Sequence, residues 1–134
     1  MIKLREYRVE DYTAIKDAVE PFCIDGDIDL ATTQGIAITA TDGDVMACGG
    51  ICMLEDEGMA WMKISKRCRE NAYVWARTIK EAFALMIESV DMPVSLYVLK
   101  GFCHGDRLAR SIGMKRTDIK EELNGNTYFK YTVK

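Results

Sequence analysis

The chain has 134 residues, of which 49% are hydrophobic and 29% charged, and its formal net charge is −3. This size and balance are typical of one folded domain with a buried core, so we expect a single domain over residues 1–134. The slightly acidic total argues against a general nucleic-acid-binding protein, because such proteins usually carry a large basic excess.

The sequence shows no signal for export or for membrane insertion. Its first twelve residues, MIKLREYRVEDY, lack the apolar core of a secretory signal. No stretch approaches the roughly 18 apolar residues that a membrane-spanning helix needs. We therefore expect a cytoplasmic protein that does not contact a membrane.

The odd number of cysteines, without an export signal, predicts reduced thiols. Cys48 and Cys52 lie four residues apart in a predicted strand, and His104 is the only histidine. Because a metal site needs several ligands at short spacing, we expect small buried thiols and no bound metal. The complete set is Cys23, Cys48, Cys52, Cys68 and Cys103.

The first predicted elements are a strand and a helix. Ile2–Arg8 alternates apolar and charged side chains, which is typical of a half-buried strand. Asp11–Val19 changes to helical spacing, and Pro21 ends that helix. Further along, Asp25-Gly26-Asp27 predicts a turn, and a short helix is one interpretation of Ile28–Thr33.

A meander of three strands is predicted next. The strands are expected at Gly35–Thr41, Val45–Leu54 and Met59–Ser65, joined by turns at Asp42-Gly43-Asp44 and Glu55–Gly58. Gly49-Gly50 interrupts the middle strand. Because glycine has no side chain, this pair predicts a bulge or a close approach of a ligand to the backbone.

The second half of the sequence alternates helices and strands. A long helix over residues 69–90 is predicted from apolar residues that recur every three or four positions. After it we expect a buried strand at Val94–Leu99, a short helix at His104–Ile112 ended by Gly113, and a hairpin of Met114–Leu123 and Asn126–Val133 around Asn124-Gly125. The predicted fold is α/β: a mixed, mostly antiparallel sheet of about seven strands flanked by three or four helices.

This order of elements resembles the GNAT N-acyltransferases over nearly the whole chain. Three stretches carry the resemblance locally: the opening strand and helix, DGDVMACGG at 42–50, and LARSIGM at 108–114. The C-terminal spacing is also similar to that of small GNAT-like proteins of tailed phages, including an internal virion protein of short-tailed phages.

The resemblance implies an acyl-CoA site where the fourth strand passes into the long helix. The family pattern there is Gln/Arg-x-x-Gly-x-Gly/Ala, whose backbone N–H groups hold the pyrophosphate. The matching stretch, Arg67-Cys68-Arg69-Glu70-Asn71-Ala72, has Glu70 in place of the central glycine, which adds bulk and repels phosphate. Basic neighbours still attract an anion, and a solvated basic helix start is the alternative. The implied cofactor-binding residues are Ile64, Ser65, Lys66, Arg67, Arg69, Asn71 and Ala72.

Two further family positions differ in this sequence. Many members carry an asparagine eleven residues before the glycine that matches Gly113, and a tyrosine, the general acid, four residues before it. Here these positions hold Phe102 and Ala109. Cys103, His104 and Ser111 lie close enough in the sequence to act as substitutes.

Three other side chains near the expected strands are acid–base candidates. His104 has a suitable intrinsic pKa, Tyr97 lies on the fifth strand, and Glu55 belongs to the acidic turn Glu55-Asp56-Glu57. Each has an alternative interpretation: a polar surface histidine, a tyrosine packed on the sheet, and a solvated turn. The catalytic candidates are therefore His104, Tyr97 and Glu55.

The family's fourth and fifth strands diverge, and backbone groups in the V-shaped gap bind pantetheine and polarise the thioester. Here the gap would lie between Met62–Ser65 and Leu96–Leu99, unless Trp61, Met62 and Tyr97 fill it. The resemblance implies an acetyl-CoA-dependent N-acetyltransferase with a degenerate cofactor loop, acting on a small amine or a protein amine.

Two alternatives stay open: a catalytically inactive GNAT-like binding or structural protein, such as a phage virion-associated or assembly protein, and a regulatory module that binds CoA without transfer. A homodimer is plausible, and the C-terminal strand Thr127–Val133 is one place where a partner strand could add.

Overall fold

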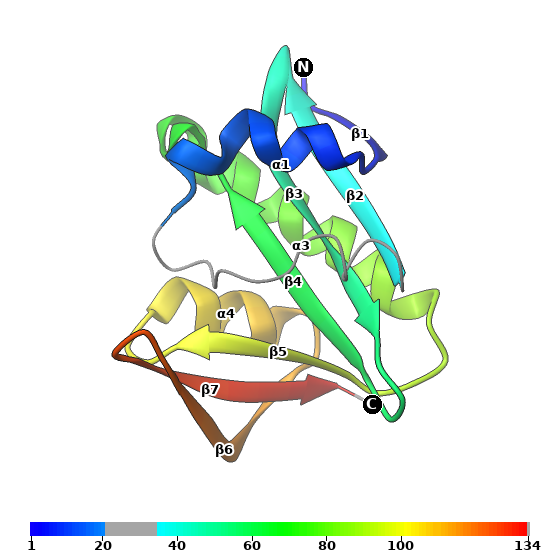
Figure 1. Cartoon of the computed structure of the whole chain (residues 1–134), viewed down its shortest axis with the longest axis vertical. Helices are drawn as coiled ribbons and strands as arrows, with labels where there is room; N and C mark the ends of the chain where they lie inside the picture. Colours follow the sequence, from blue (N-terminus) through cyan, green and yellow to red (C-terminus); the bar gives the residue numbers. More distant parts are fainter. Residues whose placement is uncertain (21–34, 134) are drawn as a thin grey trace.

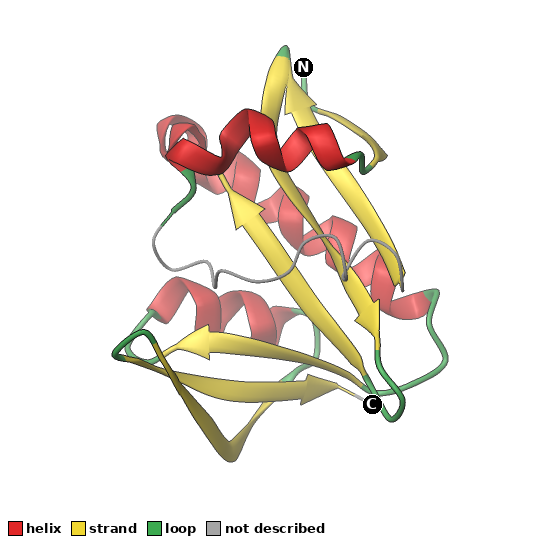
Figure 2. Ribbon diagram, viewed as in Figure 1, coloured by secondary structure: helices red, strands yellow, loops and turns green. Residues whose placement is uncertain are grey.

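The computed structural model describes residues 1–20 and 35–133. The elements in chain order are β1 (Lys3–Glu6), α1 (Val9–Ile15), the 3₁₀ helix η1 (Lys16–Ala18), β2 (Gly35–Asp42), β3 (Asp44–Met53), β4 (Gly58–Ile64), the 3₁₀ helix η2 (Lys66–Asn71), α3 (Ala72–Glu88), β5 (Val94–Leu99), α4 (Cys103–Ser111), β6 (Lys115–Leu123) and β7 (Asn126–Val133) (Figure 2). The turn and helix expected between Asp25 and Thr33 lie outside the described residues, as does Cys23.

The seven strands of the described residues belong to one sheet, in the order β1-β2-β3-β4-β5-β7-β6. Neighbouring strands are antiparallel except β4 and β5, which are parallel. The predicted α/β fold with a mixed, mostly antiparallel sheet is thereby confirmed. Within the described part of the chain, no helix is long and apolar enough to cross a membrane.

Helices cover both faces of the sheet (Figure 1). On one face, Phe83 and Met86 of α3 pack in one hydrophobic cluster with Ala109 of α4 and with side chains of β3, β4, β5 and β7. On the other face, Ile15 of α1 packs with Tyr7 and with Cys48 of β3. Side chains along β3 and β4 thus alternate between the α3/α4 face and the α1 face, as the two-residue period of a strand requires.

The predicted boundaries hold for most elements, and the long helix is the main difference. It was expected to run over residues 69–90, but residues 66–71 form the tighter η2, and α3 covers only Ala72–Glu88. Ser65 caps η2, because its side chain accepts a hydrogen bond from the Arg67 N–H at 3.2 Å. A 3₁₀ turn at the start of an α-helix is common, because it satisfies N–H groups that the first α-turn leaves open.

The glycine pair in β3 does not mark a bulge. Pairing with both neighbouring strands is regular at Gly49 and Gly50, and the irregularity between β2 and β3 falls at Ala40/Thr41 instead. A Cβ atom on Gly49 would lie 2.9 Å from the Trp61 carbonyl oxygen and 3.2 Å from the Phe83 ring. The close approach at this glycine is therefore made by α3, which the glycine lets pack directly on the sheet.

The C-terminal strand is not an open edge, so the prediction that a partner could pair with Thr127–Val133 is wrong. β7 lies between β5 and β6, and both neighbours pair with it. The last two strands form a hairpin whose turn residues Asn124 and Gly125 have φ of 52° and 81°. This tight turn, predicted from Asn-Gly, places β6 on the outside of β7.

Candidate functional site

The parallel strands β4 and β5 separate soon after they begin (Figure 1). Among the described residues, their ladder covers only the pairs Gly58–Val94 and Met59–Ser95. We call the diverging parts, Ala60–Ile64 and Leu96–Leu99, the fork. The divergence expected between the fourth and fifth strands is therefore present.

Backbone groups on both strands point into the fork. The Gly58 N–H bonds toward β5, to the Pro93 carbonyl at 2.8 Å, whereas the Ser65 N–H bonds toward β3, to the Met46 carbonyl at 2.9 Å. By strand alternation, the N–H and C=O of Met62 face the β5 side. Lys100 donates its N–H to Thr127 on the β7 side at 2.9 Å, so the backbone groups of Tyr97 face β4. The fork thus offers donors and acceptors to an extended ligand.

Helices follow both strands at the wide end of the fork, which we call the mouth. η2 and α3 follow the end of β4, and α4 follows the end of β5. Both chain segments therefore direct helix N-termini, with their partial positive charge, toward the same end of the fork. Lys66, Arg67 and Arg69 add basic side chains at this end, so the mouth favours an anion.

The predicted cofactor-binding residues all lie at the mouth. Ile64 ends β4 and Ser65 is fully buried as the cap of η2, whereas Asn71 and Ala72 are exposed at the junction with α3. The Arg67 guanidinium forms an exposed ion pair with Asp44 at 3.2 Å. These residues are contiguous at the mouth, with Ile64 and Ser65 buried beneath the exposed ones, and the sequence did not reveal that Arg67 has a carboxylate partner.

Arg69 has a stronger partner than Arg67. Its Nε and Nη2 donate to the two carboxylate oxygens of Glu20 at 2.7 and 2.6 Å. The Glu20 side chain is 9% exposed, while that of Arg69 is 63% exposed. The pair raises the pKa of Arg69, chiefly through the hydrogen bond. Sequence reasoning missed Glu20, because 49 residues separate the two partners.

The two substituted family positions contribute to the core. Ala109 is completely buried, and Phe102 packs against the cluster that α3 and α4 share with the sheet. A Cβ atom on Gly105 would lie 2.7 Å from both Phe102 and Val98, so this glycine lets the start of α4 press on β5. Neither position brings a polar side chain to the fork.

A polar cluster lies on the α1 face at the narrow end of the fork. Ser95 donates to Glu57 Oε1 at 2.5 Å, and Lys130 bonds to Glu57 Oε2 at 3.0 Å. Thr132 lies 3.0 Å from the Ser95 hydroxyl. The hydrogen bond from Ser95 and the ion pair with Lys130 outweigh desolvation and lower the pKa of Glu57.

Aromatic side chains lie on the same face. Trp61 packs edge-on against Tyr7, with ring centroids 5.5 Å apart. Its buried indole Nε1 has no hydrogen-bond partner among the described residues. Tyr97 is half-buried and pairs across the ladder with Lys130. Trp61 and Tyr97 therefore stand on the two arms of the fork, on the face opposite α3.

The three catalytic candidates are not brought together. Tyr97 lies within the fork, and the exposed His104 begins α4 at the mouth, where its ring meets Phe102 edge-on at 5.9 Å. Glu55 is exposed in the β3–β4 turn, beyond the narrow end. The third residue of that acidic turn, Glu57, is the one that points inward. Glu57 directly precedes β4, which begins at Gly58, and this position was the one feature of the sequence that could have indicated an inward-facing side chain.

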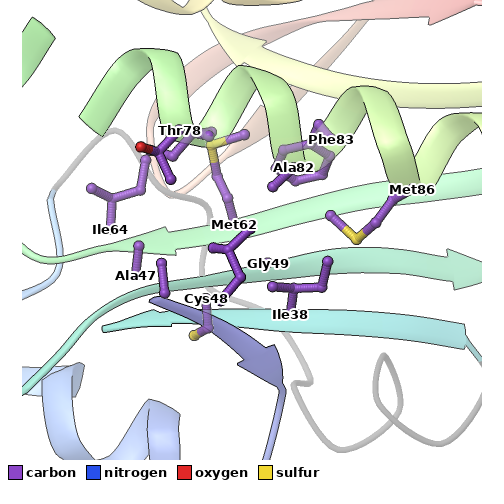
Figure 3. A pocket seen from close by; sticks show the side chains of 13 residues that line it. Ile38, Ala47, Cys48, Gly49, Met62, Ile64, Thr78, Ala82, Phe83 and Met86 are labelled. Atoms are coloured by element: carbon purple, nitrogen blue, oxygen red, sulfur yellow. The ribbon is translucent and has the colours of Figure 1, made fainter. Parts of the chain in front are cut away.

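A separate cavity of about 30 Å³ lies between α3 and the sheet (Figure 3). Apolar side chains such as Ile38, Phe83 and Met86 line it, and Met62 reaches it from β4. Since β5 and α4 contribute nothing to its lining, this cavity is a packing void of the core rather than part of the fork. Within residues 1–20 and 35–133, no group of three or more acidic, histidine or cysteine side chains could hold a metal ion.

Comparison with solved structures identifies the fold. The ribosomal-protein-S18-alanine N-acetyltransferase from Escherichia coli superposes with a TM-score of 0.71 at 14% identity, over 99% of this chain and 93% of that one. A GNAT family acetyltransferase from Streptococcus pneumoniae gives 0.70 at 15% identity, over 99% and 98%. A GNAT family acetyltransferase from Elizabethkingia anophelis with acetyl-CoA bound gives 0.68 at 12% identity, over 98% and 97%.

Searches by sequence give no further relatives: no family model matches the chain, and no curated protein matches it. The structural likeness extends over at least 93% of both chains in each comparison, so it concerns the whole fold rather than one motif. At these identities it establishes the GNAT fold and leaves the activity to be argued from the site.

Proposed function

We propose that this chain, which has the GNAT fold, binds acyl-CoA in the fork and transfers the acyl group to an amine. The observation that supports this most directly is the early separation of β4 and β5, which leaves backbone groups of Met62 and Tyr97 without strand partners in the ladder. Pantetheine carries amides that suit such groups, and a backbone N–H there would polarise a thioester carbonyl.

The mouth suits the phosphates of CoA. Lys66, Arg67 and Arg69 supply positive charge, and the η2–α3 junction at Asn71 and Ala72 supplies exposed backbone. Glu70 is exposed at the same junction and opposes them. We therefore expect acetyl-CoA or CoA to bind more weakly here than at a loop with the central glycine.

The acceptor would approach from the α1 face, where Trp61, Tyr97 and Glu57 lie. Glu57 is the proton acceptor that the geometry places best, because Ser95 and Lys130 fix its carboxylate at the narrow end of the fork. Its lowered pKa makes it a weaker base than an ordinary glutamate, so it would act on an amine that arrives partly deprotonated. Tyr97 is the candidate acid nearest the fork, while His104 and Glu55 serve as less central alternatives. The acceptor is a small amine or an amine on a protein.

A second candidate is a catalytically inactive GNAT-like binding or structural protein, including a phage virion-associated or assembly protein. The observation that favours it is the loss of polar chemistry at two positions, because Phe102 and Ala109 are both used by the core. The carboxylate partners of Arg67 and Arg69 also reduce the positive charge available to a cofactor.

An assay of thiol release from acetyl-CoA, with a panel of small amines and amine-bearing peptides, distinguishes the acyltransferase from the inactive binding or structural protein. Turnover that depends on the amine, and that Tyr97→Phe or Glu57→Gln reduces, is the expected result. Thiol release no faster than in buffer with every amine would reject acyl transfer and favour the binding or structural role.

A further inference from the structure

The backbone of Val19 and Glu20 contacts the end of β4, at the mouth of the fork. Val19 and Ser65 form an isolated antiparallel bridge, and the Glu20 N–H donates to the Ile64 carbonyl at 2.8 Å. Because the Ser65 N–H bonds to β3, the Ile64 carbonyl points to the opposite side of β4, into the fork. Val19 and Glu20 therefore lie along the free edge of β4 at the mouth.

The side chain of Glu20 fastens this contact. Both of its oxygens accept hydrogen bonds from Arg69, at 2.7 and 2.6 Å, and the carboxylate is almost entirely buried. A bidentate guanidinium–carboxylate pair is among the strongest side-chain contacts. Val19, Glu20 and Arg69 together thus form a clasp that covers the end of β4 and neutralises one of the three basic side chains at the mouth.

We propose that this clasp is an autoinhibitory contact, which a phosphate-bearing ligand must open to reach the mouth. The inference rests on the proposed function. A phosphate that takes the Nε and Nη2 donors of Arg69 leaves the Glu20 carboxylate buried without a partner, which is strongly unfavourable. Glu20 then leaves its buried position, and its N–H releases the Ile64 carbonyl. Ligand binding and the closed clasp exclude each other, so each weakens the other.

The test compares the affinity of CoA for the wild-type protein with that for Glu20→Gln, by calorimetry. The substitution keeps the size of the side chain and removes the charge that holds Arg69. We expect CoA to bind about fivefold more tightly, which converts to about 1 kcal/mol. Asp44→Asn is the matched control: it also removes a carboxylate from an arginine of η2, but Asp44 is exposed and belongs to β3, on the side of β4 opposite the fork. Its affinity should stay within about twofold of the wild type.

Hydrogen exchange supplies a second readout that does not depend on the variant. Addition of CoA to the wild-type protein should speed the exchange of the Glu20 amide, whereas an ordinary ligand slows exchange where it binds. If exchange of this amide is unchanged or slower on saturation with CoA, the proposal that the ligand opens the clasp is wrong.

The outcomes separate the two proposals. If wild type and Glu20→Gln bind CoA equally, the clasp is rejected and the CoA site stands. If only Glu20→Gln binds, both proposals are supported. If neither binds at millimolar CoA, both are rejected. If Glu20→Gln does not fold, the exchange of the Glu20 amide in the wild-type protein decides.

Discussion

Arg5 of β1 and Asp11 of α1 are joined by two hydrogen bonds of 2.8 and 2.7 Å, which fix the first helix to the edge of the sheet. Asp11 also accepts from the Thr39 hydroxyl at 2.7 Å and from the Arg8 N–H at 2.8 Å. Burial alone would raise the pKa of Asp11, but the hydrogen bonds from Arg5, Thr39 and Arg8 outweigh it and lower the pKa to about 2.

Asp11→Asn should therefore destabilise the fold by about 2 kcal/mol at pH 7, on the scale of about 1.4 kcal/mol per pKa unit. Because the pKa is lowered in the folded state, the contribution is present above the unfolded value and is lost as the pH falls toward about 2. Urea unfolding at several pH values measures it. Glu10→Gln, an exposed neighbour on the same helix, is the control, and an equal loss at pH 7 and pH 2 would contradict the account.

Gly105→Ala should destabilise the protein, although alanine is the better helix former. The new Cβ would lie 2.7 Å from the Val98 side chain and 2.7 Å from the Phe102 ring. Overpacking of this kind costs about 1–3 kcal/mol and exceeds the gain of about 1 kcal/mol in helix propensity. Thermal melts beside Arg107→Ala, an exposed position of α4, show the sign. A stabilised Gly105→Ala would mean that α4 is not pressed on β5.

Glu70→Gly should strengthen the binding of CoA, because it removes both a like charge and a side chain from the mouth. Glu70→Gln removes only the charge. We expect affinity to rise about tenfold for the glycine variant and about threefold for the glutamine variant, as for the loss of one nearby like charge. Calorimetric titration of both variants beside wild type measures this. Equal affinities in all three would show that the phosphates bind elsewhere.

Glu57→Gln should lower kcat by about 10²-fold and leave the affinity for CoA within about twofold. Asp56→Asn is a matched control in the same turn, since Asp56 is exposed and should not affect the rate. The pKa of Glu57 is lowered, so its ionisation should produce no acid limb in the rate above about pH 4.5, the usual value. A rate equally reduced in both variants would argue against a specific role for Glu57.

Much of the fold follows from local patterns in the sequence. The turn signals at Asp42-Gly43-Asp44 and Glu55–Gly58 predicted the meander, and the strand Val94–Leu99 was predicted with its observed bounds. Asn124-Gly125 predicted the last hairpin, since both residues adopt the positive φ that such a turn requires. The long helix was predicted to begin at residue 69 but begins at Ala72, because Lys66–Asn71 has no apolar period that separates a 3₁₀ turn from an α-turn.

Non-local pairs account for what the sequence did not show. The contact of Glu20 with Arg69 spans 49 residues, and that of Glu57 with Lys130 spans 73. No spacing rule relates such residues, since their proximity comes from sheet order. The same order encloses β7 between β5 and β6, which corrected the expectation that its edge is open. The fork was expected only through the family resemblance.

Calorimetric titration of the wild-type protein with acetyl-CoA tests the central claim most directly. The account predicts saturable binding at one site, and it predicts that ligand at about 100 times its Kd raises the free energy of unfolding by about 2.7 kcal/mol, visible as a higher Tm. Absence of both heat and Tm shift at millimolar acetyl-CoA, for the wild type and for Glu20→Gln alike, would contradict the claim that the fork binds acyl-CoA.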